Sequence, residues 1–128
     1  MRRALAAVTV TGLGAASVLA MTPAAQADRG DREKQGSCAN GTYEFQVERE
    51  AGGYDVSVDL DQLTPGSTWK VVLRHDGKRV SKVTRTADSD GDVEVSAWRR
   101  NTAGSDKFTF RATPAGGGQG CSATITVR

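Results

Sequence analysis

Apolar side chains recur at every second position in one short segment after another, from Gly41 almost to the last residue. Successive side chains of a β-strand point to opposite faces, so this period of two is typical of strands that bury one face. No segment beyond Gly41 shows the 3.6-residue period of a helix, and the alternation therefore predicts an all-β chain. The residues expected to face the core are Tyr43, Phe45, Val47, Tyr54, Val56, Val58, Leu60, Trp69, Val71, Leu73, Val93, Val95, Ala97, Phe108, Phe110, Ala112, Cys121, Ala123, Ile125 and Val127.

Turn residues separate the alternating segments. Asp76-Gly77 stands between two of them and is typical of a two-residue hairpin. The segment from 78 to 86 is mostly polar, and its two valines, Val80 and Val83, have opposite parities. This pattern indicates an edge strand or a strand that carries a bulge. About seven short strands in roughly 90 residues predict a single β-sandwich.

The N-terminal residues 1–27 have the order of a secretory signal peptide: a basic pair, a run of small and apolar residues, and Ala-Gln-Ala at 25–27. We expect this segment to be cleaved and the product to be secreted and soluble. The apolar run of about 17 residues is too short and too rich in Gly, Ser and Thr for a membrane span. Residues 28–36 hold no apolar side chain, so we expect a disordered lead-in, with the sandwich formed by residues 37–128.

The charge balance changes when the predicted signal peptide is removed. The chain has 17 Lys and Arg against 15 Asp and Glu, but Arg2 and Arg3 belong to the signal peptide and all the acids follow residue 27. Fifteen basic residues then face fifteen acidic ones. A near-neutral domain gives no argument for nucleic acid or an anionic membrane as a partner.

The two cysteines, Cys38 and Cys121, lie near the two ends of the predicted domain. In an exported protein such a pair is most simply a disulfide, which would here join the first strand to the last. A metal or redox pair would need a C-x-x-C spacing or nearby histidines, and the sequence has neither.

Two stretches resemble turns of known families. LDQLTPGSTWKVVLRHDG resembles the L-x-P-G-[ST]-aromatic turn of fibronectin type III and many bacterial immunoglobulin-like domains. TADSDGDVEV is similar to a hairpin of small exported actinobacterial immunoglobulin-like domains, including the neocarzinostatin-type carriers. The resemblance implies an immunoglobulin-like sandwich and no particular activity. The carriers have two internal disulfides, whereas the two cysteines of this chain can form only one. No binding residues of the carriers are therefore assigned to this chain. The expected bridge also differs from the antibody-type bond between the second and sixth strands, so Trp69 would lack that partner.

Few residues could support catalysis. The single histidine, His75, stands beside a hairpin turn, where we expect exposure and no rigid catalytic geometry. One histidine and no free cysteine also exclude most zinc and copper sites. We therefore expect no enzymatic activity and no cofactor.

Three aspartates at alternate positions, Asp88, Asp90 and Asp92, surround Gly91 and could hold a calcium ion weakly. An EF-hand loop starting at Asp88 would need a glycine at its sixth place and an acid at its twelfth, but a valine and an arginine stand there. A turn in which aspartates bond their own backbone and Gly91 adopts positive φ is the competing interpretation.

The most interesting exposed side chain is Trp98, which precedes Arg99 and Arg100 and should lie on the outer face or at a strand end. A tryptophan flanked by arginines can stack on a sugar or on another protein, or can simply cover the open end of the sandwich. We expect a noncatalytic module that binds an extracellular protein or a cell-envelope glycan. The alternative is a small-ligand carrier, or an inhibitor of an exported enzyme, working through the loops at 99–106 and 114–120.

Overall fold

The computed structural model describes residues 32–128, and they form eight strands and no helix. The predicted signal peptide and residues 28–31 lie outside the described residues. Within the described part, no helix is long and apolar enough to cross a membrane. The strands are β1 (Arg32–Cys38), β2 (Gly41–Glu50), β3 (Gly53–Asp61), β4 (Thr68–His75), β5 (Lys78–Thr86), β6 (Val93–Arg100), β7 (Asp106–Pro114) and β8 (Cys121–Val127).

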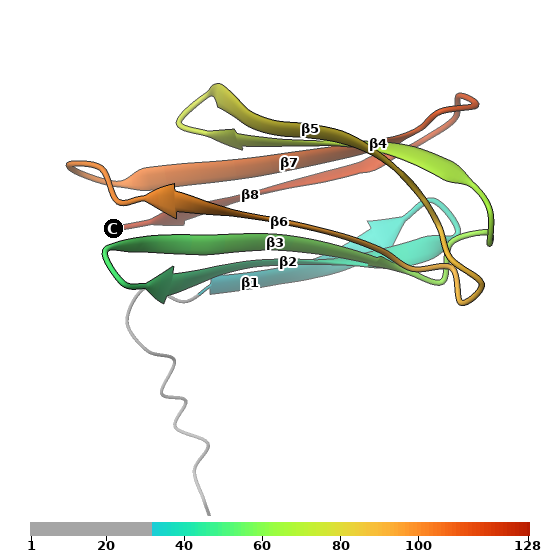
Figure 1. Cartoon of the computed structure of the whole chain (residues 1–128), viewed down its shortest axis with the longest axis horizontal. Helices are drawn as coiled ribbons and strands as arrows, with labels where there is room; N and C mark the ends of the chain where they lie inside the picture. The colour runs from blue at the N-terminus through green and yellow to red at the C-terminus, as the bar shows by residue number, and fades with distance from the viewer. Residues whose placement is uncertain (1–31) are drawn as a thin grey trace, which may run out of the picture.

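The strands form two antiparallel sheets of four, in the orders β1-β2-β3-β6 and β5-β4-β7-β8. Figure 1 shows the two groups, with β5, β4, β7 and β8 above β6, β3, β2 and β1. The all-β sandwich predicted from the alternation is therefore confirmed. Each sheet turns one face to the shared core and the other face outward, as the period of two requires.

The core is built from the residues that the alternation selects. Sixteen of the twenty are buried, and the other four, Tyr43, Ala97, Cys121 and Ala123, pack against them half-buried. Aromatic rings join the sheets edge to face, with Phe45 and Phe110 at 4.9 Å between centroids. Contacts of this kind add to the stabilisation from burial itself.

The expected disordered lead-in is wrong from residue 32 onward, because residues 32–36 belong to β1. This strand pairs with β2 along its whole length, from Arg32 opposite Val47 to Cys38 opposite Gly41. A ladder of this kind is made by backbone N–H and C=O groups, so a polar edge strand needs no apolar side chains to form. The sandwich consequently has eight strands where about seven are expected.

The sequence predicts that the polar segment from 78 to 86 is an edge strand or carries a bulge, and both predictions are confirmed. Strand β5 lies at the edge of its sheet, and its register against β4 shifts between Leu73 and Arg74. The bulge explains why Val80 and Val83 differ in parity and yet both pack against the core.

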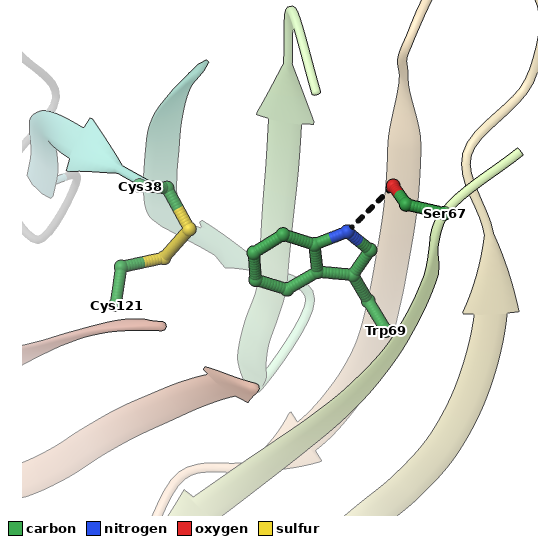
Figure 2. The surroundings of a disulfide bond; sticks show 4 residues. All are labelled: Cys38, Ser67, Trp69 and Cys121. Atoms are coloured by element: carbon green, nitrogen blue, oxygen red, sulfur yellow. Dashed lines mark hydrogen bonds between the residues drawn. A yellow bond between two sulfur atoms is a disulfide. The ribbon is translucent and has the colours of Figure 1, made fainter. Parts of the chain in front are cut away.

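The disulfide between Cys38 and Cys121 is confirmed, with the Cα atoms 4.9 Å apart. Strands β1 and β8 are edge strands of different sheets, so the bond ties the two sheets together at one side of the sandwich. The bond is not an antibody-type bridge, as expected, but Figure 2 shows the six-membered ring of the Trp69 indole pointing toward it. Its Nε1–H donates to the Ser67 hydroxyl at 3.0 Å.

Candidate functional site

The three candidate binding residues of β6 do not share one face. Trp98 and Arg100 point outward, and Arg99 has the parity of the core residues. Arg99 is half-buried opposite Tyr54, and its buried Nε has no hydrogen-bond partner among the described residues. The structure therefore separates the tryptophan from one of the two arginines predicted to act with it.

Trp98 is 48% exposed, the one large hydrophobic side chain that residues 32–128 expose to this extent. Its indole lies over Gly53, where an added Cβ would stand only 2.5 Å from Cζ2. The indole N–H points to the Glu50 carbonyl oxygen at 3.4 Å. An aromatic ring laid over a glycine protects the neighbouring strand, so Trp98 covers part of the backbone while one side of its ring stays open to solvent.

The aspartate turn is tied down by its own backbone. One oxygen of Asp88, Oδ1, accepts hydrogen bonds at 2.9 Å from the N–H groups of Asp90 and Asp92. Gly91 has a φ of 79°, and a Cβ there would stand 2.2 Å from the Leu63 carbonyl oxygen. The three exposed carboxylates can also bring one oxygen each within 4.8 Å of one another, a spacing that could hold a cation. The turn is established by these contacts, and calcium binding stays a prediction.

His75 is buried, at 5% exposure, and the expected exposure beside the hairpin is wrong. Its ring stacks on Phe108 with 4.4 Å between centroids, and its Nε2 lies 2.7 Å from Oδ1 of Asp106. The residue ends β4 with the parity of the core, and Asp106 starts the neighbouring strand β7 fully buried. A buried carboxylate supplies the partner that allows an imidazole to leave water.

The histidine belongs to a polar cluster that holds the loop between β6 and β7. Oδ1 of Asp106 also accepts hydrogen bonds from the Thr102 hydroxyl at 2.5 Å and from its N–H at 3.2 Å. Burial acts to raise the pKa of Asp106, but the hydrogen bonds from Thr102 and His75 hold it below its ordinary value. The Asp76 carboxylate lies 3.5 Å from the imidazole and accepts a bond from the Lys107 N–H. These contacts fix the loop against the hairpin.

The outward face of the sheet β1-β2-β3-β6 is acidic, although the overall composition is nearly neutral. Its strands place one cation outward, Arg100, against eight carboxylates, and we call this surface the acidic face. Burial, followed by repulsion from Glu94 and Asp61, raises the pKa of Asp59. The carboxylates of the acidic face are Glu33, Glu44, Glu48, Glu50, Asp55, Asp59, Asp61 and Glu94.

The outward face of the sheet β5-β4-β7-β8 is basic. Among the residues that the structure describes, its outward strand positions hold six cations and no carboxylate, and we call this surface the basic face. No ion pair joins any of these exposed cations to a carboxylate within residues 32–128. A hollow of about 320 Å³ lies in this sheet around Val72, Arg74 and Arg111. The cations of the basic face are Lys70, Arg74, Arg79, Lys82, Lys107 and Arg111.

Sequence reasoning missed these two surfaces, although the parity of the charges carried a signal. Acidic residues hold most outward positions from 44 to 61, and basic residues hold most of those from 70 to 82. The net charge averages the two groups to nearly zero. The alternation alone could not show that they belong to different sheets.

Comparisons with known proteins add little. No family model matches the sequence, and no curated protein matches it. Among solved structures, an endonuclease/exonuclease/phosphatase from Beutenbergia cavernae DSM 12333 is similar with a TM-score of 0.46 and 18% identity. The match covers 75% of this chain and 27% of that one, so the described sandwich corresponds to about a quarter of that protein. A likeness of this degree carries no inference about activity.

Proposed function

We propose that the protein is an exported, noncatalytic, immunoglobulin-like module that binds an extracellular protein or cell-envelope glycan carrying negative charge, through the basic face. The disulfide supports export, because such bonds persist in oxidising compartments. The two antiparallel sheets, β1-β2-β3-β6 and β5-β4-β7-β8, packed face to face, support an immunoglobulin-like sandwich.

The observation that carries the proposal is the basic face. Like charges on one surface repel each other, and here no carboxylate stands among them at the outward strand positions that the structure describes. A field of one sign attracts ligands of the opposite sign and speeds their encounter. Threonine hydroxyls stand beside the cations, at Thr84, Thr109 and Thr113, and can donate hydrogen bonds to sulfate, phosphate or carboxylate oxygens.

The geometry around the histidine favours a noncatalytic role. In hydrolases that use a hydroxyl nucleophile, the hydroxyl bonds to the imidazole, which takes its proton. Here the Thr102 hydroxyl bonds to Asp106, and the imidazole of His75 is buried against Phe108. The arrangement is that of a structural hydrogen-bond cluster.

The alternative, a small-ligand carrier, is supported by a hollow beside the loop at 114–120. A hollow of about 290 Å³ there is lined by residues that include Arg111, Gly118 and Ser122. Carriers of apolar ligands generally use clefts with mostly hydrophobic walls. This hollow has a charged and polar lining, so the basic face is the better supported site.

Retention on envelope material tests the proposal. The protein, purified from the exported fraction, would be mixed with washed envelope from the same culture and sedimented. We expect retention that falls with salt and is lost in a Lys70→Glu/Arg111→Glu variant. The matched control is Arg85→Glu/Arg128→Glu, which reverses two exposed charges off the basic face. Equal retention of both double variants would contradict the proposal. Circular dichroism checks that each variant is folded.

A further inference from the structure

The two charged faces lie on opposite sides of the same sandwich. The sheets of a sandwich pack about 10 Å apart, and the outward side chains add to that separation. At physiological ionic strength the Debye length is about 8 Å, so the acidic face and the basic face of one molecule do little to neutralise each other. Each stays available to a partner of opposite charge.

From this placement we propose that copies of the chain stack face to face, the acidic face of one copy docking on the basic face of the next. The inference shares with the proposed function only the assumption that the outward sheet faces bind partners. The carboxylates of the acidic face and the cations of the basic face are complementary in sign, and both surfaces are built on four antiparallel strands.

A second copy of the chain carries a partner of opposite charge for the acidic face and for the basic face. A polyanion could bind only the basic face. The acidic face also gains most from a cationic partner. Burial raises the pKa of Asp59, and repulsion from the nearby carboxylates of Glu94, Asp61 and Glu44 raises it further. Lysine and arginine side chains brought over these carboxylates would relieve that repulsion. The cations for this purpose are present on the same chain.

Each face also offers one apolar element to the contact. Trp98 stands half-exposed at the edge of the acidic face, and Val72 lies half-buried in the hollow of the basic face. Arg74 and Arg111 also line this hollow. An indole ring between arginines gains from cation–π attraction as well as from burial, and buried tryptophans are common anchors of protein interfaces.

The size of the faces indicates weak association. Four strands about 4.8 Å apart and about seven residues long, at about 3.3 Å each, cover roughly 450 Å². Two such faces bury roughly 900 Å² in total, which is below the range of about 1,200–2,000 Å² for stable specific complexes. Because the two contacting faces differ, each docked copy leaves one face free, and the assembly grows as a chain or closes as a ring.

Sedimentation velocity of the protein purified from the exported fraction tests the inference. At about 20 mM salt we expect a weight-average sedimentation coefficient that rises with protein concentration, and at about 500 mM salt a monomer at every concentration. Two variants sharpen the test. Lys70→Glu/Arg111→Glu leaves four cations and two carboxylates on the basic face, and Glu48→Lys/Glu94→Lys leaves six carboxylates and three cations on the acidic face.

Each face variant alone should associate more weakly than the wild type at low salt, because one of its two faces has lost more than half of its net charge. Their equimolar mixture should regain association, because the acidic face of the first variant and the basic face of the second are unchanged. The control Arg85→Glu/Arg128→Glu should associate like the wild type. A wild type that stays monomeric at low salt, or a Lys70→Glu/Arg111→Glu variant that associates as strongly as the wild type, overturns the inference. If the monomeric wild type is nevertheless retained on envelope material, the proposed function stands and only self-association fails.

Discussion

The buried pair of His75 and Asp106 gives the sharpest test of how this sandwich is held together. We expect Asp106→Ala to destabilise the protein by about 1–3 kcal/mol, because the buried imidazole loses its acceptor at 2.7 Å and keeps only the Asp76 carboxylate at 3.5 Å. Thr102 is exposed, so its hydroxyl and N–H regain water and add less to the loss. His75→Phe keeps the stacking on Phe108 but leaves the carboxylate with only the Thr102 donors.

A double-mutant cycle separates the pair from these other effects. Hydrogen bonds to charged groups contribute about 1.5–3 kcal/mol, so the double variant should lose less stability than the sum of the single losses, by about that amount. The assay is urea unfolding at neutral pH, followed by circular dichroism. Losses that add to within about 0.5 kcal/mol would refute the coupling, since independent sites behave in that way.

The pair also predicts a pH dependence of stability. The folded state holds the pKa of Asp106 below its ordinary value of 3.8, so the unfolded chain takes up this proton first as the pH falls. The stabilisation is therefore complete above about pH 5 and is lost as the pH falls through the folded pKa. Asp106→Asn cannot titrate, and its stability should fall less steeply below about pH 4 than that of the wild type. Parallel curves would contradict the assignment.

Three further predictions concern the bridge, the exposed tryptophan and the aspartate turn. Replacing Cys38 and Cys121 by serine should destabilise the protein by up to about 4.5 kcal/mol in urea unfolding, since the bond spans 83 positions; a loss under about 1 kcal/mol would show that β1 and β8 hold their places without it. Trp98→Ala should weaken self-association at low salt and lower stability by about 1 kcal/mol, through the uncovered Gly53; global unfolding of this variant would assign the ring a purely structural role. Asp88→Ala should cost about 1–2 kcal/mol in chelator and in calcium alike, because the Asp88 carboxylate caps the turn; a calcium-dependent rise in melting temperature that this variant abolishes would instead reveal an ion site.

The alternation predicted the core closely because the direction of a side chain along a strand is a local property of the backbone. Val56 and Val58 face inward whichever strands lie beside them. The same logic selected Cys121, which is half-buried in the position that parity gives it. Even the mixed parity of Val80 and Val83 was informative, because it indicated the bulge opposite Leu73 and Arg74.

The two errors in the fold have physical causes that composition does not reveal. Strand β1 forms through backbone hydrogen bonds to β2, so its polar side chains gave no sign of it. His75 is buried because Asp106, thirty-one residues later in the chain, supplies a carboxylate partner. A polar residue next to a hairpin is exposed by default, and only a distant partner changes that outcome.

The sequence by itself determined which side of each strand is apolar, where the turns fall, and that two cysteines could close the domain. Only the tertiary structure decided which strands share a sheet, and with it which outward charges stand together. The physical reason is that side-chain parity follows from local backbone geometry, whereas strand order depends on pairings between distant segments. Glu44 meets Asp59 and Lys82 joins the row of Arg111 through such pairings, and a nearly neutral chain becomes a sandwich with one acidic and one basic face.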